Sequence, residues 1–272
     1  MLPIQSNLTA ITVPESSLMV LTHLRDFAKM KDGQWDIFFS PGSSLFFETM
    51  GRESGICREL TNKWLTQDDR GMWGGKYFKL TPTTGPLAAF APFEAELVSP
   101  LRLRRMVSGQ NVSIMNQCFS PATGTADKTA RWLQRRHLVH VNRGNFDDRS
   151  HYPANENMIS SLTIYLSDRF ERAPREYRIG LDTRGRTIFA HKFDHTAGII
   201  VHPRGVTPRI TFFDPNYGQF TFKEFGVSGF LGWLPYWYAY SYGNLLKEWR
   251  VRTYRRSSEY MPTWRGKVTY DR

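Results

Sequence analysis

Hydrophobic residues recur at helical spacing in three segments of the first half of the chain. In "SLMVLTHLRDFAKMK" (17–31), apolar positions fall three or four residues apart, which predicts an amphipathic helix. "ICRELTNKWL" (56–65) follows a glycine and predicts a second helix. "TADKTARWLQRRHLV" (125–139) predicts a third, with Thr125 or Asp127 as its N-cap. Between these segments, residues 41–55 are loop-rich. Residues 70–93 hold many Gly and Pro, so we expect mostly loop there, with a short helix.

The second half alternates short β-branched and aromatic runs with turn signals, which is typical of an antiparallel meander. The predicted strands are 176–181, 186–193, 196–203 and 209–214, with turns at Asp182–Gly185 and Arg204–Pro208. Residues 160–170 carry mixed helix and strand signals, and 240–256 predicts a last helix and a final strand. A helical first half followed by a sheet indicates an α+β fold.

Composition indicates a folded chain of 272 residues, with 40% hydrophobic and 14% aromatic residues. The formal net charge of +11 permits binding to nucleic acid or to an anionic membrane surface. The basic residues form only short clusters, with no zinc-finger array and no long basic helix, so we expect no nucleic-acid partner. The N-terminus shows no signal-peptide pattern, and the apolar run 229–240 is too short to span a bilayer. We expect a soluble protein that needs no cleaved signal if it is exported.

The candidate nucleophile is Cys57, at the predicted start of the helix 56–65. The partial positive charge at a helix N-terminus favours thiolate over thiol, and the cysteine N–H points to where an oxyanion would form. Trp64 falls on the same helix face seven residues on. The alternative is that Cys57 is a small buried apolar residue. Cys118 starts no predicted helix and is interpreted as structural.

The partners that a catalytic thiol needs are an imidazole and, often, a group that orients the imidazole. If residues 196–203 and 209–214 form a hairpin, His195 and Asp214 lie about equally far from its turn. Residues opposite each other in such a pair are about 5 Å apart and diagonal neighbours about 7–8 Å, within reach of a His–Asp hydrogen bond. His191 lies about 13 Å farther along the strand, and His202 lies too close to the turn.

A metal site is a weaker alternative interpretation of the segment that contains His195. In "HKFDH" (191–195), the two histidines share one strand face while Asp194 lies on the other, and no third ligand is near in the sequence. The glycines of "GMWGGKYF" (71–78) lack the spacing of a phosphate-binding loop. We therefore expect neither a metal nor another cofactor.

Three segments now resemble the YopT and AvrPphB type of bacterial effector cysteine protease, a branch of the papain-like clan. They are "GIC" ending at Cys57 with Trp64 behind it, "HTAG" starting at His195, and "FFDPNYGQF" around Asp214. The last segment is the most specific, since in that family a strand delivers the catalytic aspartate into a Pro-Asn-x-Gly turn. The histidine segment departs from the pattern, because alanine is commoner where Thr196 stands. The resemblance covers roughly residues 50–66 and 188–255.

This resemblance implies a papain-like α+β fold with a helical half packed on an antiparallel sheet. It implies one catalytic domain over residues 1–272, with an N-terminal extension of about 1–45. Cys57 would be the nucleophile, His195 the general base and then acid, and Asp214 the orienting group. The substrate would be a host signalling protein such as a small GTPase or a kinase. The protein would reach the host cytosol by translocation without a cleaved signal peptide.

One departure concerns the oxyanion donor, because family members carry an amide side chain shortly before the cysteine. None of residues 52–56 is Asn or Gln, so either the Cys57 N–H acts with help from elsewhere, or Arg52 or Ser54 substitutes. Two other functions stay open. A Cys-His-Asp acyl-transfer enzyme (a transglutaminase, deamidase or peptidoglycan amidase) has the same residues, and a catalytically silent binding module keeps the fold. The aromatic run 230–242 is interpreted as core rather than substrate groove.

Overall fold

A computed structural model describes most of the predicted elements of the chain. The described residues are 15–39, 57–66, 78–97, 133, 138–140, 150–151, 158–171, 176–186, 192–202, 209–223, 226–242 and 246–256. The helices are α1 (Glu15–Met30), α3 (Cys57–Leu65), α6 (Met158–Glu171) and α7 (Gly226–Tyr242), with a short 3₁₀ helix, η2 (Gly85–Ala89). The strands are β1 (Gly33–Phe38), β2 (Phe78–Pro82), β3 (Phe93–Leu97), β4 (Leu138–His140), β5 (Ser150–His151), β6 (Tyr177–Arg186), β7 (Lys192–Val201), β8 (Ile210–Asp214), β9 (Gly218–Phe222) and β10 (Leu246–Arg256).

The strands form one mixed sheet in the order β2-β3-β1-β9-β8-β7-β6-β10-β4, with β5 also paired to β10. Among the described pairs, β1 with β3 is the parallel one, and the others are antiparallel. At its centre, β6, β7, β8 and β9 follow one another as an antiparallel meander, as the turn signals predict. This meander carries two of the three candidate catalytic residues.

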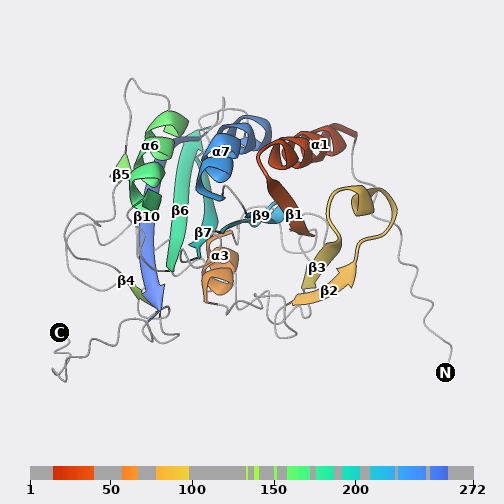
Figure 1. Cartoon of the computed structure of the whole chain (residues 1–272), viewed down its shortest axis with the longest axis horizontal. Coiled ribbons are helices and arrows are strands. Elements are labelled where there is room, and N and C mark those ends of the chain that lie inside the picture. The colour runs from red at the N-terminus through yellow and green to blue at the C-terminus, as the bar shows by residue number, and fades with distance from the viewer. Residues whose placement is uncertain are drawn as a thin grey trace.

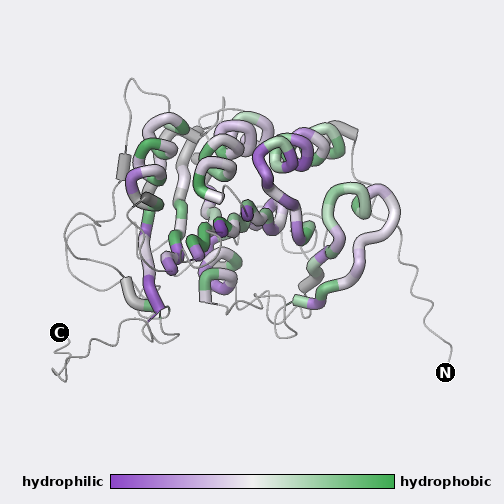
Figure 2. Tube along the Cα trace, viewed as in Figure 1, coloured by the Kyte–Doolittle hydropathy of each residue, from purple (hydrophilic) through white to green (hydrophobic). Residues whose placement is uncertain are grey.

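Helices cover the two faces of the sheet unequally. Helices α1, α6 and α7 lie along one face, whereas α3 lies across the other (Figure 1). One hydrophobic core fills the space under α1, α6 and α7, and a smaller core lies under α3. Hydrophobic positions gather along the central strands between these layers (Figure 2). Of the active-site candidates, Cys57 therefore comes from the helix on one face, and His195 and Asp214 come from the sheet itself.

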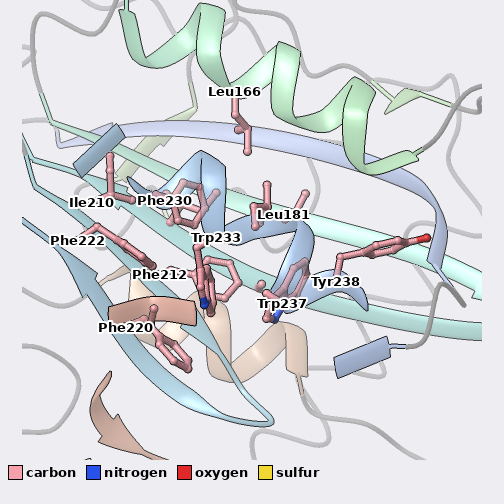
Figure 3. Packing of buried hydrophobic residues seen from close by; sticks show 14 of the residues in the cluster. Leu166, Leu181, Ile210, Phe212, Phe220, Phe222, Phe230, Trp233, Trp237 and Tyr238 are labelled. Carbon is pink, nitrogen blue, oxygen red and sulfur yellow. The ribbon is translucent and has the colours of Figure 1, made fainter. Parts of the chain in front are cut away.

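Helix α7 is almost entirely apolar because it lies in the middle of the larger core. Trp233, Trp237 and Phe230 project from it onto Phe212 and Phe220 of the sheet (Figure 3). The rings of Phe212 and Trp237 meet edge to face, with their centroids 5.2 Å apart. Large aromatic side chains packed in this way contribute strongly to core stability. The predicted assignment of this aromatic run to the core is confirmed for these residues.

The turn predicted at Asp182–Gly185 is wrong, because β6 continues through it to Arg186. Strand β6 is paired on both sides, with β7 and with β10, over almost its whole length. Two ladders of hydrogen bonds outweigh the local turn preference of Asp and Gly. The predicted strand 186–193 is accordingly divided. Its first residue ends β6, its last two begin β7, and 187–191 lie outside the described residues.

The division into a helical first half and a sheet-forming second half is also wrong. Residues 78–97, which overlap the stretch 70–93 expected to be mostly loop with a short helix, form the hairpin β2–β3 around the short helix η2. Strand β1 lies between β3 and β9 in the sheet. It belongs to residues 15–39, within the range of about 1–45 that we interpreted as an N-terminal extension. Helices packed on a mostly antiparallel sheet do agree with the expected α+β class.

Two further segments settle predictions that the local pattern left ambiguous or misread. Residues 160–170, whose signals are mixed, belong to α6, because one side of that segment packs on α7 and β10. Of the predicted helix 125–139, Leu133 is helical and Leu138–His140 is strand β4; the rest lies outside the described residues. None of the helices that the structure describes is long and apolar enough to cross a membrane.

Candidate active site

Helix α3 lies alongside β7, and two contacts fix its position. The Thr61 hydroxyl donates a hydrogen bond to the Thr196 carbonyl oxygen at 2.9 Å. One turn later, Trp64 lies against Gly198, where a Cβ would come within 2.8 Å of the indole. Both elements therefore run in the same direction. Cys57 lies one turn before Thr61, about 6 Å back along the axis of α3. The start of the helix is therefore level with His195, the residue before Thr196 on β7.

The far end of α3 is held by polar contacts that reach across the sheet. Trp64 Nε1–H donates to Gln219 Oε1 at 3.0 Å, and Gln219 Nε2 donates to Asp36 Oδ2 at 3.3 Å. Behind it, the buried Arg178 donates to the Leu65 carbonyl oxygen at 2.5 Å, at the C-terminus of the helix. A cation there also complements the helix dipole. These bonds limit how far α3 can slide, and so hold its N-terminal cysteine in place.

The turn after β8 orients the carboxylate of Asp214. The Tyr217 N–H donates to the Asp214 carbonyl oxygen at 3.0 Å, and the Asn216 N–H donates to Asp214 Oδ1 at 2.8 Å. Such a side-chain bond two residues forward is the usual role of Asp at the start of a turn. Gly218 ends the turn with φ of 101°, where a Cβ would meet the Ile37 carbonyl oxygen at 1.9 Å. The "DPNYG" segment therefore both turns the chain and fixes the carboxylate.

The register of β7 and β8 brings His195 to this carboxylate. Gly198 is opposite Phe213, so Asp214 is level with the next residue of β7, Ala197. His195 is therefore a diagonal neighbour of Asp214 rather than its direct partner, two residues away from the register we expected. Its Nε2 lies 3.0 Å from Asp214 Oδ1, and both side chains are buried. The predicted His–Asp contact is present through the diagonal.

The carboxylate of Asp214 accepts hydrogen bonds at both of its oxygens. Oδ1 receives the Asn216 N–H and faces His195 Nε2. Oδ2 accepts from Trp237 Nε1–H at 2.7 Å and from the Tyr242 hydroxyl at 2.8 Å. A buried carboxylate accepting several hydrogen bonds is stabilised in its ionised form. Helix α7 thus supplies two of the groups that hold this acid.

Charges in the site favour a protonated imidazole beside an ionised carboxylate. Burial by itself would lower the pKa of His195, but the charges and hydrogen bonds of Asp214 and Cys57 raise it to about 10. Burial would raise the pKa of Asp214, but the His195 charge and hydrogen bond, with those of Asn216 and Trp237, lower it. Burial and the Asp214 charge raise the pKa of Tyr242 well above its usual value, so its hydroxyl stays protonated.

Cys57 approaches the imidazole from α3, which lies on the face of the sheet opposite α7 (Figure 1). It is the first residue of α3, is partly exposed, and forms a side-chain hydrogen bond with His195. Because His195 Nε2 faces Asp214 and Tyr242, we assign the contact with the sulfur to Nδ1. The three residues singled out from the sequence are therefore brought together, and Cys57 is partly exposed.

The other candidates from the sequence lie elsewhere or outside the described residues. His202 contacts Thr211 and Arg209 near the far end of β7, and His23 stacks on Tyr240 at the helical face. His191, Cys118, Arg52 and Ser54 lie outside the described residues, as do His137 and the turn at Arg204–Pro208. His140 and His151 lie on β4 and β5, next to β10. Within the described residues, no group of three or more His, Cys, Asp or Glu could hold a metal ion.

Two residues of the site, Trp237 and Tyr242, are missing from the sequence-based prediction. Both lie in the aromatic run of α7, where Trp233 and Phe230 have similar apolar surroundings and serve the core alone. The spacing of five between Trp237 and Tyr242 places them about 140° apart around the helix axis, so helix periodicity does not link them. What distinguishes these two aromatic residues from their neighbours is that the fold places Asp214 next to them.

Comparison with solved structures finds a structural similarity, whereas the two other comparisons find nothing. No protein-family model matches the sequence, and no curated protein is significantly similar to it. Among solved structures, the chain is similar to the crystal structure of the Pseudomonas avirulence protein AvrPphB, at 11% sequence identity and a TM-score of 0.42. The similarity covers 74% of this chain and 93% of that one. Values this low do not assign a function, so the function is argued below from the side chains of the site.

Proposed function

We propose that this protein is a thiol protease in which Cys57 is the nucleophile, His195 the general base and acid, and Asp214 the orienting group. The observation that carries the proposal is the position of the His195 imidazole. It contacts the Asp214 carboxylate through Nε2 at 3.0 Å and a cysteine at the start of a helix through its other side. A nucleophile, a base and a third group that holds the base are the parts that thiol acyl chemistry requires.

The chemistry follows from these roles in two steps. The Cys57 thiolate attacks the carbonyl carbon of a peptide bond, the C–N bond breaks, and the His195 imidazolium gives its Nδ1 proton to the leaving amine. A water molecule then attacks the thioester while the neutral imidazole takes a proton from the water. The carboxylic acid product leaves and the sulfur is released as thiolate. Throughout, Asp214 keeps the imidazole oriented and stabilises its charged form.

Stabilisation of the oxyanion falls in part to the helix. Cys57 is the first residue of α3, and the first N–H groups of a helix have no acceptor within it. The Cys57 N–H therefore offers one donor near the point where negative charge develops, supported by the helix dipole. A second donor from Arg52 or Ser54 remains part of the proposal.

The resemblance in sequence extends the proposal to fold and biological setting. We propose a papain-like arrangement of the catalytic residues and the role of a translocated bacterial effector that cleaves a host signalling protein, such as a small GTPase or a kinase. The formal net charge of +11 suits a substrate near an anionic membrane surface.

A proteomic comparison tests the proposed function. Extract of a eukaryotic host cell is incubated with the wild-type protein or with Cys57→Ala, and new peptide N-termini are mapped by mass spectrometry. Cys118→Ala, which removes the other cysteine of the chain, serves as the matched control. New termini in the wild-type and Cys118→Ala samples, absent with Cys57→Ala, support a protease. Cys57-dependent deamidation or crosslinking without new termini favours acyl transfer instead, and no Cys57-dependent change contradicts both activities.

A further inference from the structure

The hydroxyl of Tyr242 is positioned between the imidazole and the carboxylate of the proposed catalytic residues. Its oxygen lies 2.8 Å from His195 Nε2, 2.8 Å from Asp214 Oδ2 and 3.2 Å from Asn216 Nδ2. The tyrosine is buried at the last position of α7, and its ring centroid lies 4.9 Å from that of His195. A hydroxyl group in this position touches both partners of the His–Asp pair.

The hydrogen-bonding capacity of a phenol determines how these three contacts are made. A tyrosine hydroxyl has one O–H to donate and two lone pairs that accept. The ionised carboxylate of Asp214 can only accept, so the O–H bond points to Asp214 Oδ2. The amide nitrogen of Asn216 can only donate, so it takes one lone pair. The remaining lone pair faces His195 Nε2, which therefore carries a proton.

The opposite assignment leaves two acceptors in contact. If Tyr242 donated its proton to His195 Nε2, no hydrogen would lie between the tyrosine oxygen and Asp214 Oδ2, which are 2.8 Å apart. Neither carboxylate oxygen has a proton to offer, because every other group that bonds to them is a donor: the Asn216 N–H and the Trp237 Nε1–H. Two unprotonated oxygens at that distance in a buried site are strongly unfavourable.

We propose that Tyr242 is a positioning residue that, together with Asp214, keeps the proton of His195 on Nε2 and so leaves Nδ1 to exchange a proton with Cys57. This inference rests on the proposed catalytic role of Cys57 and His195. The Nε2–H is shared between the Asp214 oxygen and the Tyr242 oxygen, so both acceptors fix the ring orientation. The aromatic run of α7 thereby contributes to the chemistry as well as to the core.

The test uses the full-length protein and iodoacetamide as the probe. The rate constant for alkylation of Cys57 is measured by mass spectrometry between pH 5 and 9 for the wild type, Tyr242→Phe and Tyr240→Phe. Tyr240→Phe is the matched control, because it also removes a tyrosine hydroxyl from α7. The Tyr240 ring stacks on His23 and Phe27 at the exposed side of the helix. We expect Tyr242→Phe to lower the rate at pH 7 by about three- to tenfold, the effect of one hydrogen bond, with Tyr240→Phe unchanged.

A spectroscopic readout in the unmutated protein keeps the inference testable if Tyr242→Phe does not fold. In the ¹H–¹⁵N spectrum of the imidazole groups, the Nε2 of His195 should carry a proton, and that proton should show a nuclear Overhauser contact to the Tyr242 ring. A proton on Nδ1 alone, or an Nε2 proton without contact to Tyr242, overturns the inference. Equal alkylation rates and pH profiles for folded Tyr242→Phe and wild type also overturn it.

These outcomes separate the inference from the proposed function. If Tyr242→Phe slows alkylation but host proteins show no Cys57-dependent change, Tyr242 positions the imidazole while the proposed protease function fails. If host proteins are cleaved in a Cys57-dependent way but Tyr242→Phe matches wild type, the protease proposal stands and this inference fails.

Discussion

The Nε2 atom of His195 lies 3.0 Å from Asp214 Oδ1, although the two residues are diagonal rather than opposite across β7 and β8. A diagonal pair on one sheet face has its Cα atoms farther apart than an opposite pair, and the long imidazole side chain spans the difference. The carboxylate reaches back because the turn at Asn216 fixes its rotamer. The strand that ends on an acid followed by Pro-Asn thus directs that acid to the histidine.

Replacement of the orienting acid should be less damaging than loss of the base. In Asp214→Asn, Tyr242 still contacts His195 Nε2, so some orientation of the ring survives. We expect Cys57 alkylation to fall about three- to tenfold in Asp214→Asn, the effect of weakening one hydrogen bond, and to fall further in His195→Ala. Rate constants for the two variants at pH 7 make the comparison. Equal losses in both variants would mean that Asp214 is as essential as the imidazole itself.

Gly198 should be needed for α3 to approach β7. A Cβ at this position would lie 2.8 Å from the Trp64 ring, so Gly198→Ala must displace the helix that carries Cys57. We expect a loss of about 1–3 kcal/mol in the free energy of unfolding, together with slower alkylation of Cys57. Gly180→Ala is the matched control, because Gly180 is opposite Gly198 on β6 and a Cβ there meets its nearest atom only at 3.5 Å. Similar urea midpoints for the two variants would argue against this packing constraint.

Trp237 should matter to the site and Trp233 to the core alone. Both indoles donate one hydrogen bond, Trp237 to Asp214 Oδ2 and Trp233 to the Leu24 carbonyl oxygen at 3.2 Å. Substitution of either by Phe should destabilise the fold by about 1–3 kcal/mol, since each leaves a buried acceptor with one donor fewer. Only Trp237→Phe should also slow Cys57 alkylation, because it loosens the carboxylate that holds His195. An equal slowing in Trp233→Phe would show that the effect is general softening of the core.

Stability should depend on pH through His195. The variant considered is Cys57→Ala, which keeps the charge and the hydrogen bond of Asp214, two of the causes that raise the pKa of His195. Above pH 6.5 the folded protein retains a proton that the unfolded chain releases, so the free energy of unfolding falls as the pH rises. We expect a fall of about 1–3 kcal/mol between pH 6.5 and 9, measured by urea denaturation. The double variant Cys57→Ala/His195→Gln is the reference; an identical slope in both variants would contradict the raised pKa.

The sequence was sufficient to find the three candidate catalytic residues because each has a local signal. A glycine before Cys57 and helical periodicity after it indicate a helix start, and a hairpin symmetric about residues 204–206 pairs His195 with Asp214 to within two residues. The two-residue error arises because a turn of unknown length sets the register, which composition does not reveal.

What the sequence could not provide depends on contacts between distant elements. Strands β2 and β3 form where Gly and Pro predicted loop, because their pairing with each other and with β1 compensates for weak local preference. In the same way, two flanking strands carry β6 through Asp182–Gly185. The hydroxyl of Tyr242 and the indole of Trp237 join the site only because α7 lies over the end of β8.

The most direct test of the account is the rate at which iodoacetamide alkylates Cys57 at pH 7 in the wild type and in His195→Gln, with Cys118 in the same chain as internal reference. The imidazole of His195 should activate the sulfur as a nucleophile. We predict that wild-type Cys57 reacts faster than Cys118 and that His195→Gln lowers the Cys57 rate by about ten- to a hundredfold while the Cys118 rate stays unchanged. Equal Cys57 rates in the wild type and in folded His195→Gln would contradict activation of the cysteine by this histidine.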